Sequence, residues 1–134
     1  MTNWPNYYPA DVPPEHASHA SGVAYRIVRT IPPSAIDFRS THEEWTERGV
    51  PVPAELLWMA CGTSVHTELE GSVATRRRFK PLRNRRIVVG ELVAAHGKML
   101  PTQGDHPSHV TVWFYVGSTP ELAFTIDAEG ARDQ

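Results

Sequence analysis

The sequence predicts one small α+β domain with a mainly antiparallel sheet of five or six strands and two or three helices. Three observations support this fold class. The chain has 134 residues, enough for a single hydrophobic core without disulfides or structural metals. Its composition, 40% hydrophobic and 21% charged, is ordinary for a globular protein. Its apolar runs mix strand and helix periods without the regular β-α-β alternation of a parallel fold.

Residues 1–20 are predicted to form an irregular arm in front of a single domain at 21–127, with a short tail at 128–134. Trp4, Tyr7 and Tyr8 are too apolar for a solvated segment, so we expect the arm to lie on the domain surface, with a flexible end as the alternative. The arm contains prolines that disfavour helix and remove backbone donors: Pro5, Pro9, Pro13 and Pro14.

The first strand is expected at Val23–Arg29, where apolar residues alternate until Pro32 and Pro33 stop the pattern. Ser34 is then a candidate N-cap, with Asp37 in the position of a capping acid. The following helix would place three apolar residues on one stripe and end near Gly49; these residues are Ala35, Phe38 and Trp45.

The middle of the chain is less regular. Glu55–Cys61 fits either a buried helical turn or a strand, and β-branched residues favour a short strand at Thr63–Thr67. A helix is predicted from Glu68 or Glu70 to Phe79, where the approach of Pro81 ends it.

The last third of the sequence predicts mostly strands. Arg86–Val93 and His109–Val116 have strong strand patterns, with a shorter extended piece at Gly97–Pro101. A turn at Gly117–Pro120 would let Leu122–Ile126 return as a hairpin partner of the preceding strand.

Trp113 and Tyr115 would point away from Phe114 on the last strong strand. An open aromatic face is one interpretation. We expect instead a second core that a helix or the N-terminal arm covers.

The order of these elements resembles a family of small bacterial proteins with no known activity. The resemblance spans about residues 8–115 and implies one domain without implying a function. The matching segments are Gly22–Arg29, Pro32-Pro33, Asp37-Phe38 with Ser40, Gly62–Val65, the basic helix, Arg86–Leu92, and His109 before Trp113.

The most distinctive feature of the sequence is a basic segment with no acid in it. The rest of the chain has six basic and 15 acidic residues, a formal net charge of −9, so the segment creates a strong internal asymmetry. We expect it to contact an acidic partner, a protein more than a nucleic acid; a merely solvated helix face is the alternative. The basic residues are Arg76, Arg77, Arg78, Lys80, Arg83, Arg85 and Arg86.

A second hypothesis is an ADP-ribosyltransferase-like enzyme with NAD as its cofactor. Folds of that class carry an Arg on an early strand, then a Ser, then a Glu, and here Arg26, Ser64 and either Glu91 or Glu121 occur in that order. The Arg would bind a phosphate and the Glu would stabilise an oxocarbenium-like centre. The usual Ser-Thr-Ser run is absent from the chain, and neither Glu91 nor Glu121 belongs to a Glu-x-Glu pair.

The histidines suggest a weaker alternative, a metal site at His106 and His109 that His66 or His96 would complete. Two solvated histidines on a loop are the commoner outcome, so we predict no metal. Cys61 is interpreted as a buried thiol, with a nucleophile assisted by His66 as the alternative.

The leading interpretation is therefore a non-enzymatic accessory protein that needs no cofactor, although the sequence does not decide whether the chain is an enzyme. One cysteine, no signal-peptide pattern and no apolar run near the ~20 residues of a membrane span favour a cytoplasmic location. The oligomeric state is not indicated by the sequence.

Overall fold

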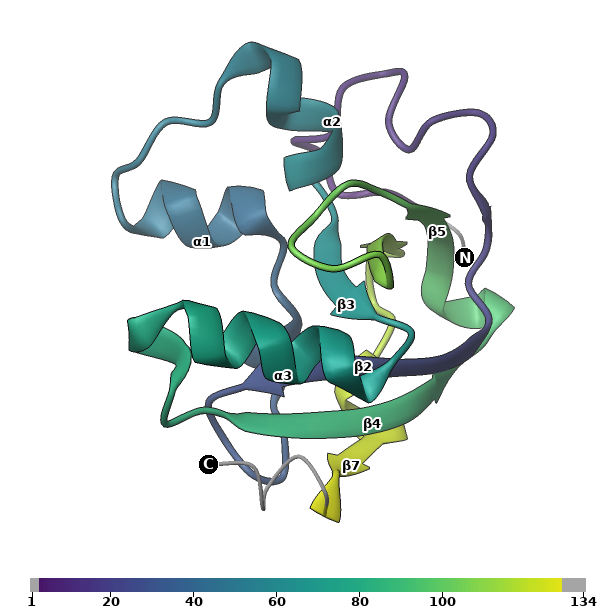
Figure 1. Ribbon diagram of the computed structural model, residues 1–134. Coiled ribbons are helices and arrows are strands. Elements are labelled where there is room, and N and C mark those ends of the chain that lie inside the picture. The colour runs from purple at the N-terminus through teal and green to yellow at the C-terminus, as the bar shows by residue number, and fades with distance from the viewer. Residues whose placement is uncertain (1–2, 129–134) are drawn as a thin grey trace.

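The computed structural model describes residues 3–128. Seven strands in this part of the chain form one antiparallel sheet in the order β1-β5-β6-β3-β2-β4-β7 (Figure 1). The α+β class is confirmed, with more strands than the sequence predicts. The strands are β1 (Ser18–His19), β2 (Gly22–Val28), β3 (Thr63–His66), β4 (Arg86–Leu92), β5 (Gly97–Pro101), β6 (His109–Phe114) and β7 (Phe124–Ile126).

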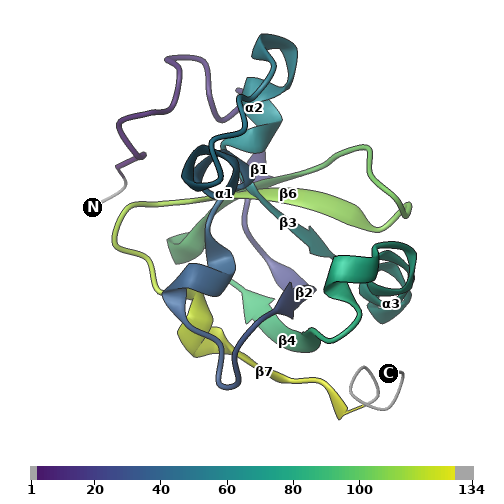
Figure 2. The same ribbon diagram turned by 90° about the vertical axis from the view of Figure 1, so that its left-hand side faces the viewer.

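Within residues 3–128, one α-helix packs on the sheet, and the other two contact each other. α3 (Leu69–Arg78) lies against β2 and β3. α1 (Thr41–Glu47) contacts α2 (Leu57–Ala60), which lies above α1 in Figure 2. Short 3-10 turns complete the connections: η1 (Ala35–Phe38), η2 (Ala54–Leu56), η3 (Lys80–Leu82), η4 (Ala94–His96) and η5 (Pro120–Ala123). No helix in the described part of the chain is long and apolar enough to cross a membrane.

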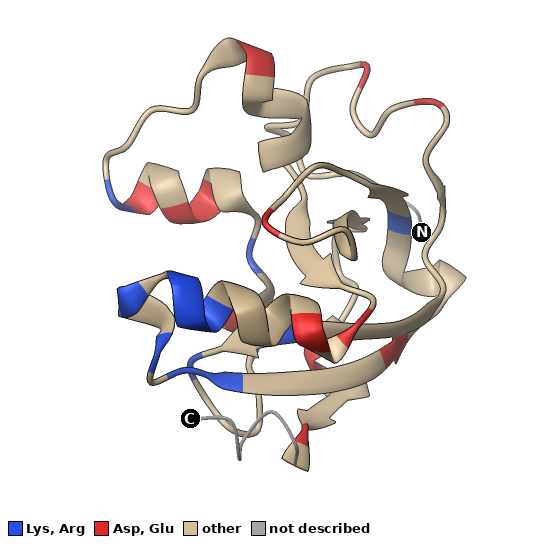
Figure 3. Cartoon of the chain, viewed as in Figure 1, with Lys and Arg blue, Asp and Glu red and all other residues tan. Residues whose placement is uncertain are grey.

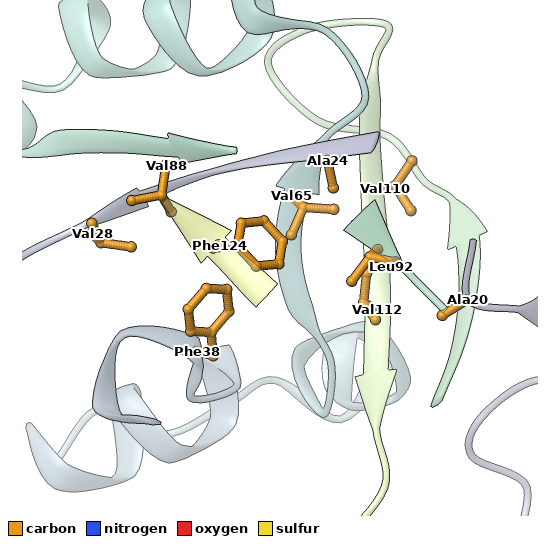
Figure 4. Packing of buried hydrophobic residues seen from close by; sticks show 10 residues of the cluster. All are labelled: Ala20, Ala24, Val28, Phe38, Val65, Val88, Leu92, Val110, Val112 and Phe124. Carbon is orange, nitrogen blue, oxygen red and sulfur yellow. The ribbon is translucent and has the colours of Figure 1, made fainter. Parts of the chain in front are cut away.

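The main core lies on one face of the sheet, where alternate residues of the central strands meet (Figure 4). Phe38, from η1, closes this core and packs against the rings of Phe114 and Phe124. The ten buried members are Ala20, Ala24, Val28, Phe38, Val65, Val88, Leu92, Val110, Val112 and Phe124.

A second core forms on the opposite face, beneath the N-terminal arm. Trp113 is fully buried there beside Val12 and Cys61. Trp4 of the arm stacks on Tyr115 at a centroid distance of 4.4 Å. The second core expected for this aromatic face is thus present, and the thiol of Cys61 is buried with its pKa raised to about 11 by desolvation.

The N-terminal arm contributes a strand that its prolines do not predict. Its last residues form β1, which pairs with β5 and places Ser18 opposite Met99. This pairing adds a strand that the proline pattern hides, which is one reason why the sheet has seven strands.

The single helix expected after Ser34 is instead two elements. η1 ends at Phe38, and α1 begins again at Thr41 with Ser40 as its N-cap. Ser40 Oγ accepts from the Glu43 backbone N–H, and Glu43 accepts from the Ser40 backbone N–H, a reciprocal pair that starts a new helix.

The hairpin predicted between His109–Val116 and Leu122–Ile126 is wrong. Both sides of β6 are already occupied by β3 and β5, so β7 pairs with β4 instead. Gly90 on β4 allows β7 to pair so closely, because a Cβ at this position would lie 2.4 Å from the Ala123 carbonyl oxygen.

Candidate functional site

The basic segment runs from the C-terminal half of α3 through η3 into the start of β4 (Figure 3). Five of its side chains are exposed, and we call them the basic strip: Arg77, Arg78, Lys80, Arg83 and Arg86. Arg78 forms an ion pair with Asp105 at 3.0 Å and lies over the ring of Phe79, 5.5 Å from its centroid.

Two arginines of the segment are not part of this surface. Arg76 is only 2% exposed, and one of its Nη atoms donates to the Arg85 carbonyl oxygen at 3.1 Å. It therefore ties α3 to the loop before β4, and its expected place on an exposed contact face is wrong. Arg85 is half-buried and lines the cleft described next.

A cleft of about 760 Å³ opens between α1 and α3, beside the basic strip. Its size is within the range of small-molecule sites. Residues of β2 and β3 line it, together with residues of the turn after α3. The lining of the cleft includes Tyr25, Arg26, Arg39, Trp45, Ser64, His66, Thr75 and Phe79.

Arg26 links the strands at the base of this cleft. Its Nε donates to the Asp37 carbonyl oxygen at 3.0 Å, and an Nη donates to the Ser64 carbonyl oxygen at 2.9 Å. Arg26 is two residues from the core residues Ala24 and Val28, so it shares their face of the sheet. Ser64 is directly next to the core residue Val65, so it lies on the opposite face. The Arg26 and Ser64 side chains therefore leave the sheet on opposite faces, although both line the cleft.

The arrangement needed for ADP-ribosyl transfer is only partly present. Arg26 and Ser64 reach the same cleft, but its lining includes neither Glu91 nor Glu121. Glu91 is exposed on β4, and Glu121 lies in η5 beside a separate hollow of about 300 Å³. Arg26 also has its guanidinium engaged by two backbone carbonyls, which gives it a structural role.

A chain of hydrogen bonds orients Ser64. Its Oγ lies 3.0 Å from His109 Nε2, and His109 Nδ1 lies 3.0 Å from Thr102 Oγ1 and 3.3 Å from the Thr102 carbonyl oxygen. Desolvation lowers the pKa of His109, so its ring is neutral at neutral pH. If Nδ1 carries the proton, Nε2 accepts from the Ser64 hydroxyl.

His66 is a buried titratable group of the cleft, with 5% of its surface exposed. Burial, together with the nearby His109 and His106, lowers its pKa to about 4. Its Nδ1 lies 3.1 Å from Ser72 Oγ.

The metal alternative needs a third ligand. The rings of His106 and His109 both approach that of His66, at centroid distances of 6.3 Å and 5.6 Å. Even so, no group of three or more His, Cys, Asp or Glu residues within 3–128 is placed to hold a metal ion.

Sequence reasoning missed the cleft itself, together with Arg39, Trp45 and Thr75 on its walls. Trp45 and Thr75 are on separate helices, Arg39 lies in the segment before α1, and no motif joins them. The comparisons with known proteins add no assignment: no family model, curated protein or solved structure matches the chain.

Proposed function

We propose that the chain is a non-enzymatic interaction protein that contacts an acidic partner through the basic strip. The observation that carries this proposal is the exposure of five cationic side chains on one short stretch of an otherwise acidic chain. Guanidinium groups make paired hydrogen bonds to carboxylates, so such a stretch suits a partner rich in Asp and Glu.

The surroundings favour an acidic protein segment over nucleic acid. Glu68 and Glu70 flank the strip at the start of α3, and α1 carries Glu43, Glu44 and Glu47 across the cleft (Figure 3). A long polyanion extending beyond the strip would meet this acidic surface, whereas a short acidic segment would not.

An aromatic residue within the strip also suits a protein interface. Phe79 is 41% exposed between Arg78 and Lys80. Arginine and aromatic residues are enriched at the centres of protein interfaces.

The test is binding of the intact chain to a fluorescent poly-glutamate peptide and to generic DNA and RNA, each over a salt titration. We expect binding to the peptide that weakens with salt, and weaker binding to either nucleic acid at matched charge. Replacing Arg77, Arg78, Lys80 and Arg83 with Ser should abolish peptide binding; Arg76 is left intact because it is buried.

Lys98→Ser is the matched control, since this basic residue lies on β5, outside the strip. Thermal unfolding must show that each variant is folded. Peptide binding that survives in the folded quadruple variant contradicts the proposal. Tighter binding to DNA or RNA than to the peptide would show that the acidic partner is a nucleic acid and not a protein.

A further inference from the structure

The cleft between α1 and α3 concentrates polar atoms that the fold leaves unsatisfied. In the described part of the chain, four buried side-chain nitrogen or oxygen atoms have no hydrogen-bond partner. Three of these belong to residues that line this cleft: Arg39 Nε, His66 Nε2 and Thr75 Oγ1.

Such atoms are costly in a folded protein, since each loses its hydrogen bonds to water without a replacement. One isolated case has many explanations. Three such residues, from the segment before α1, from β3 and from α3, line one cleft, and Arg39 also borders the smaller hollow. A molecule that supplies both donors and acceptors would satisfy them together.

The charge of the cleft indicates the sign of that molecule. Five arginines and two glutamates are among its described lining residues, so the lining has a formal excess of positive charge. Arg39 is already paired with Glu47 through one Nη, and its buried Nε still lacks an acceptor. A further anionic oxygen would complete this guanidinium.

The walls of the cleft indicate the rest of the ligand. Trp45 on α1, Phe79 after α3 and Tyr25 on β2 contribute aromatic surface. The volume of about 760 Å³ exceeds the needs of a lone phosphate or carboxylate and suits a ligand of nucleotide size.

We propose that the cleft binds a small phosphorylated ligand with a planar ring, whose phosphate meets Arg39 and whose polar groups complete His66 and Thr75. Guanidinium forks match phosphate oxygens, and a planar ring stacks on aromatic side chains. This site does not depend on the basic strip or on the proposed acidic partner.

The experiment is calorimetry on the full chain with AMP, adenosine and inorganic phosphate, together with NMR titration to locate the shifts. We expect AMP to bind more tightly than either half of the molecule, with shifts at Thr75, His66 and Arg39. NAD in a parallel titration shows whether a dinucleotide is accepted.

Two variants test the unsatisfied atoms directly. Thr75→Val removes a buried hydroxyl without a partner, so it should leave the melting temperature unchanged or raise it while weakening AMP binding about fivefold. Arg39→Gln should weaken AMP binding about tenfold or more, because a charged hydrogen bond is lost.

Ser118→Ala is the matched control. Ser118 Oγ is the fourth unsatisfied atom, and it lines the smaller hollow instead of the cleft. This variant, and the quadruple Ser variant of the basic strip, should bind AMP like the original chain.

Three outcomes overturn the proposal. The first is the absence of AMP binding at millimolar concentration, which would leave water as the hydrogen-bond partner of the unsatisfied atoms in the cleft. The second is a set of NMR shifts confined to the basic strip. The third is AMP binding that folded Thr75→Val and Arg39→Gln both leave unchanged.

Discussion

β3 and β6 have two very different faces. On one face, Val65, Val110 and Val112 are buried in an aliphatic core. On the other, Ser64 and His109 are joined by a hydrogen bond near the cleft.

The difference shows how one pair of strands can serve both stability and binding. The aliphatic face excludes water and contributes free energy in proportion to the apolar area it buries. The polar face depends on directional bonds and leaves atoms such as His66 Nε2 without partners. Disturbing each face in turn should therefore produce effects of different size and kind.

The largest effect is expected from the aliphatic face. Phe38→Ala should lower the free energy of unfolding by about 3–5 kcal/mol, because it removes a buried ring and leaves a cavity between Phe114 and Phe124. Urea denaturation followed by circular dichroism measures this loss. The exposed Phe79→Ala should change stability by about 0.5 kcal/mol or less, and equal losses in the two variants would refute the assigned core.

A smaller effect is expected from Arg26 on β2, whose side chain donates to backbone carbonyls of η1 and β3. Arg26→Met keeps much of the aliphatic stem but removes the donors to the Asp37 and Ser64 carbonyls, so the loss should be about 2–3 kcal/mol. The same denaturation experiment measures it. Arg83→Met on the exposed strip is the control, with an expected change within about 0.5 kcal/mol. A similar small change in Arg26→Met would show that the two bonds contribute little.

The polar face should also make stability depend on pH. His66 has a folded pKa of about 4 against 6.5 for the free side chain, so the unfolded chain takes up a proton first as the pH falls. Stability is then complete above pH 6.5 and decreases toward pH 4. Between pH 7.5 and 5 the expected loss from His66 is about 1–2 kcal/mol, after allowance for solvent screening.

Urea titrations at the two pH values measure this change, and His66→Phe should reduce it. The groups that act on His66 are His109, His106, Asp105 and Arg26, of which only Asp105 raises its pKa. His109 has a lowered pKa of its own, so part of the dependence should remain in the variant. An unchanged dependence in His66→Phe would show that His66 titrates normally.

The sequence predicted best where a local pattern determines the structure. The strand pattern at Val23–Arg29 appears as β2, and the patterns at Arg86–Val93 and His109–Val116 appear as β4 and β6 with slightly shorter ends. The helix before Pro81 appears as α3. In each case, the alternating or helical spacing of apolar residues indicates which side chains are buried.

The failures have non-local causes. The partner of β7 depends on which strand has a free edge and on the small size of Gly90, neither of which the 122–126 pattern contains. β1 is two residues long, and only its pairing with β5 defines it. Arg76 looks like its exposed neighbours in the sequence, but its position on α3 turns it inward.

The candidate site was predicted in part for the same reason. A run of basic residues is visible in any sequence, so the exposed strip was found. Arg26 and Ser64 were selected by their order, and they do reach one cleft. The contributions of Arg39 and Thr75 depend on the packing of α1 and α3 around β3, which no local pattern specifies.

The backbone pairing of the sheet is shortest at the junction between β2 and β3. These strands share one paired position, Tyr25 with His66, whereas β2 and β4 pair along seven positions. The sheet thus consists of a four-strand half and a three-strand half with few backbone hydrogen bonds between them, and the Arg26 side chain spans the gap. Arg26 therefore adds a side-chain hydrogen bond at the point where the two halves share the least backbone pairing, and strands from both halves line the cleft.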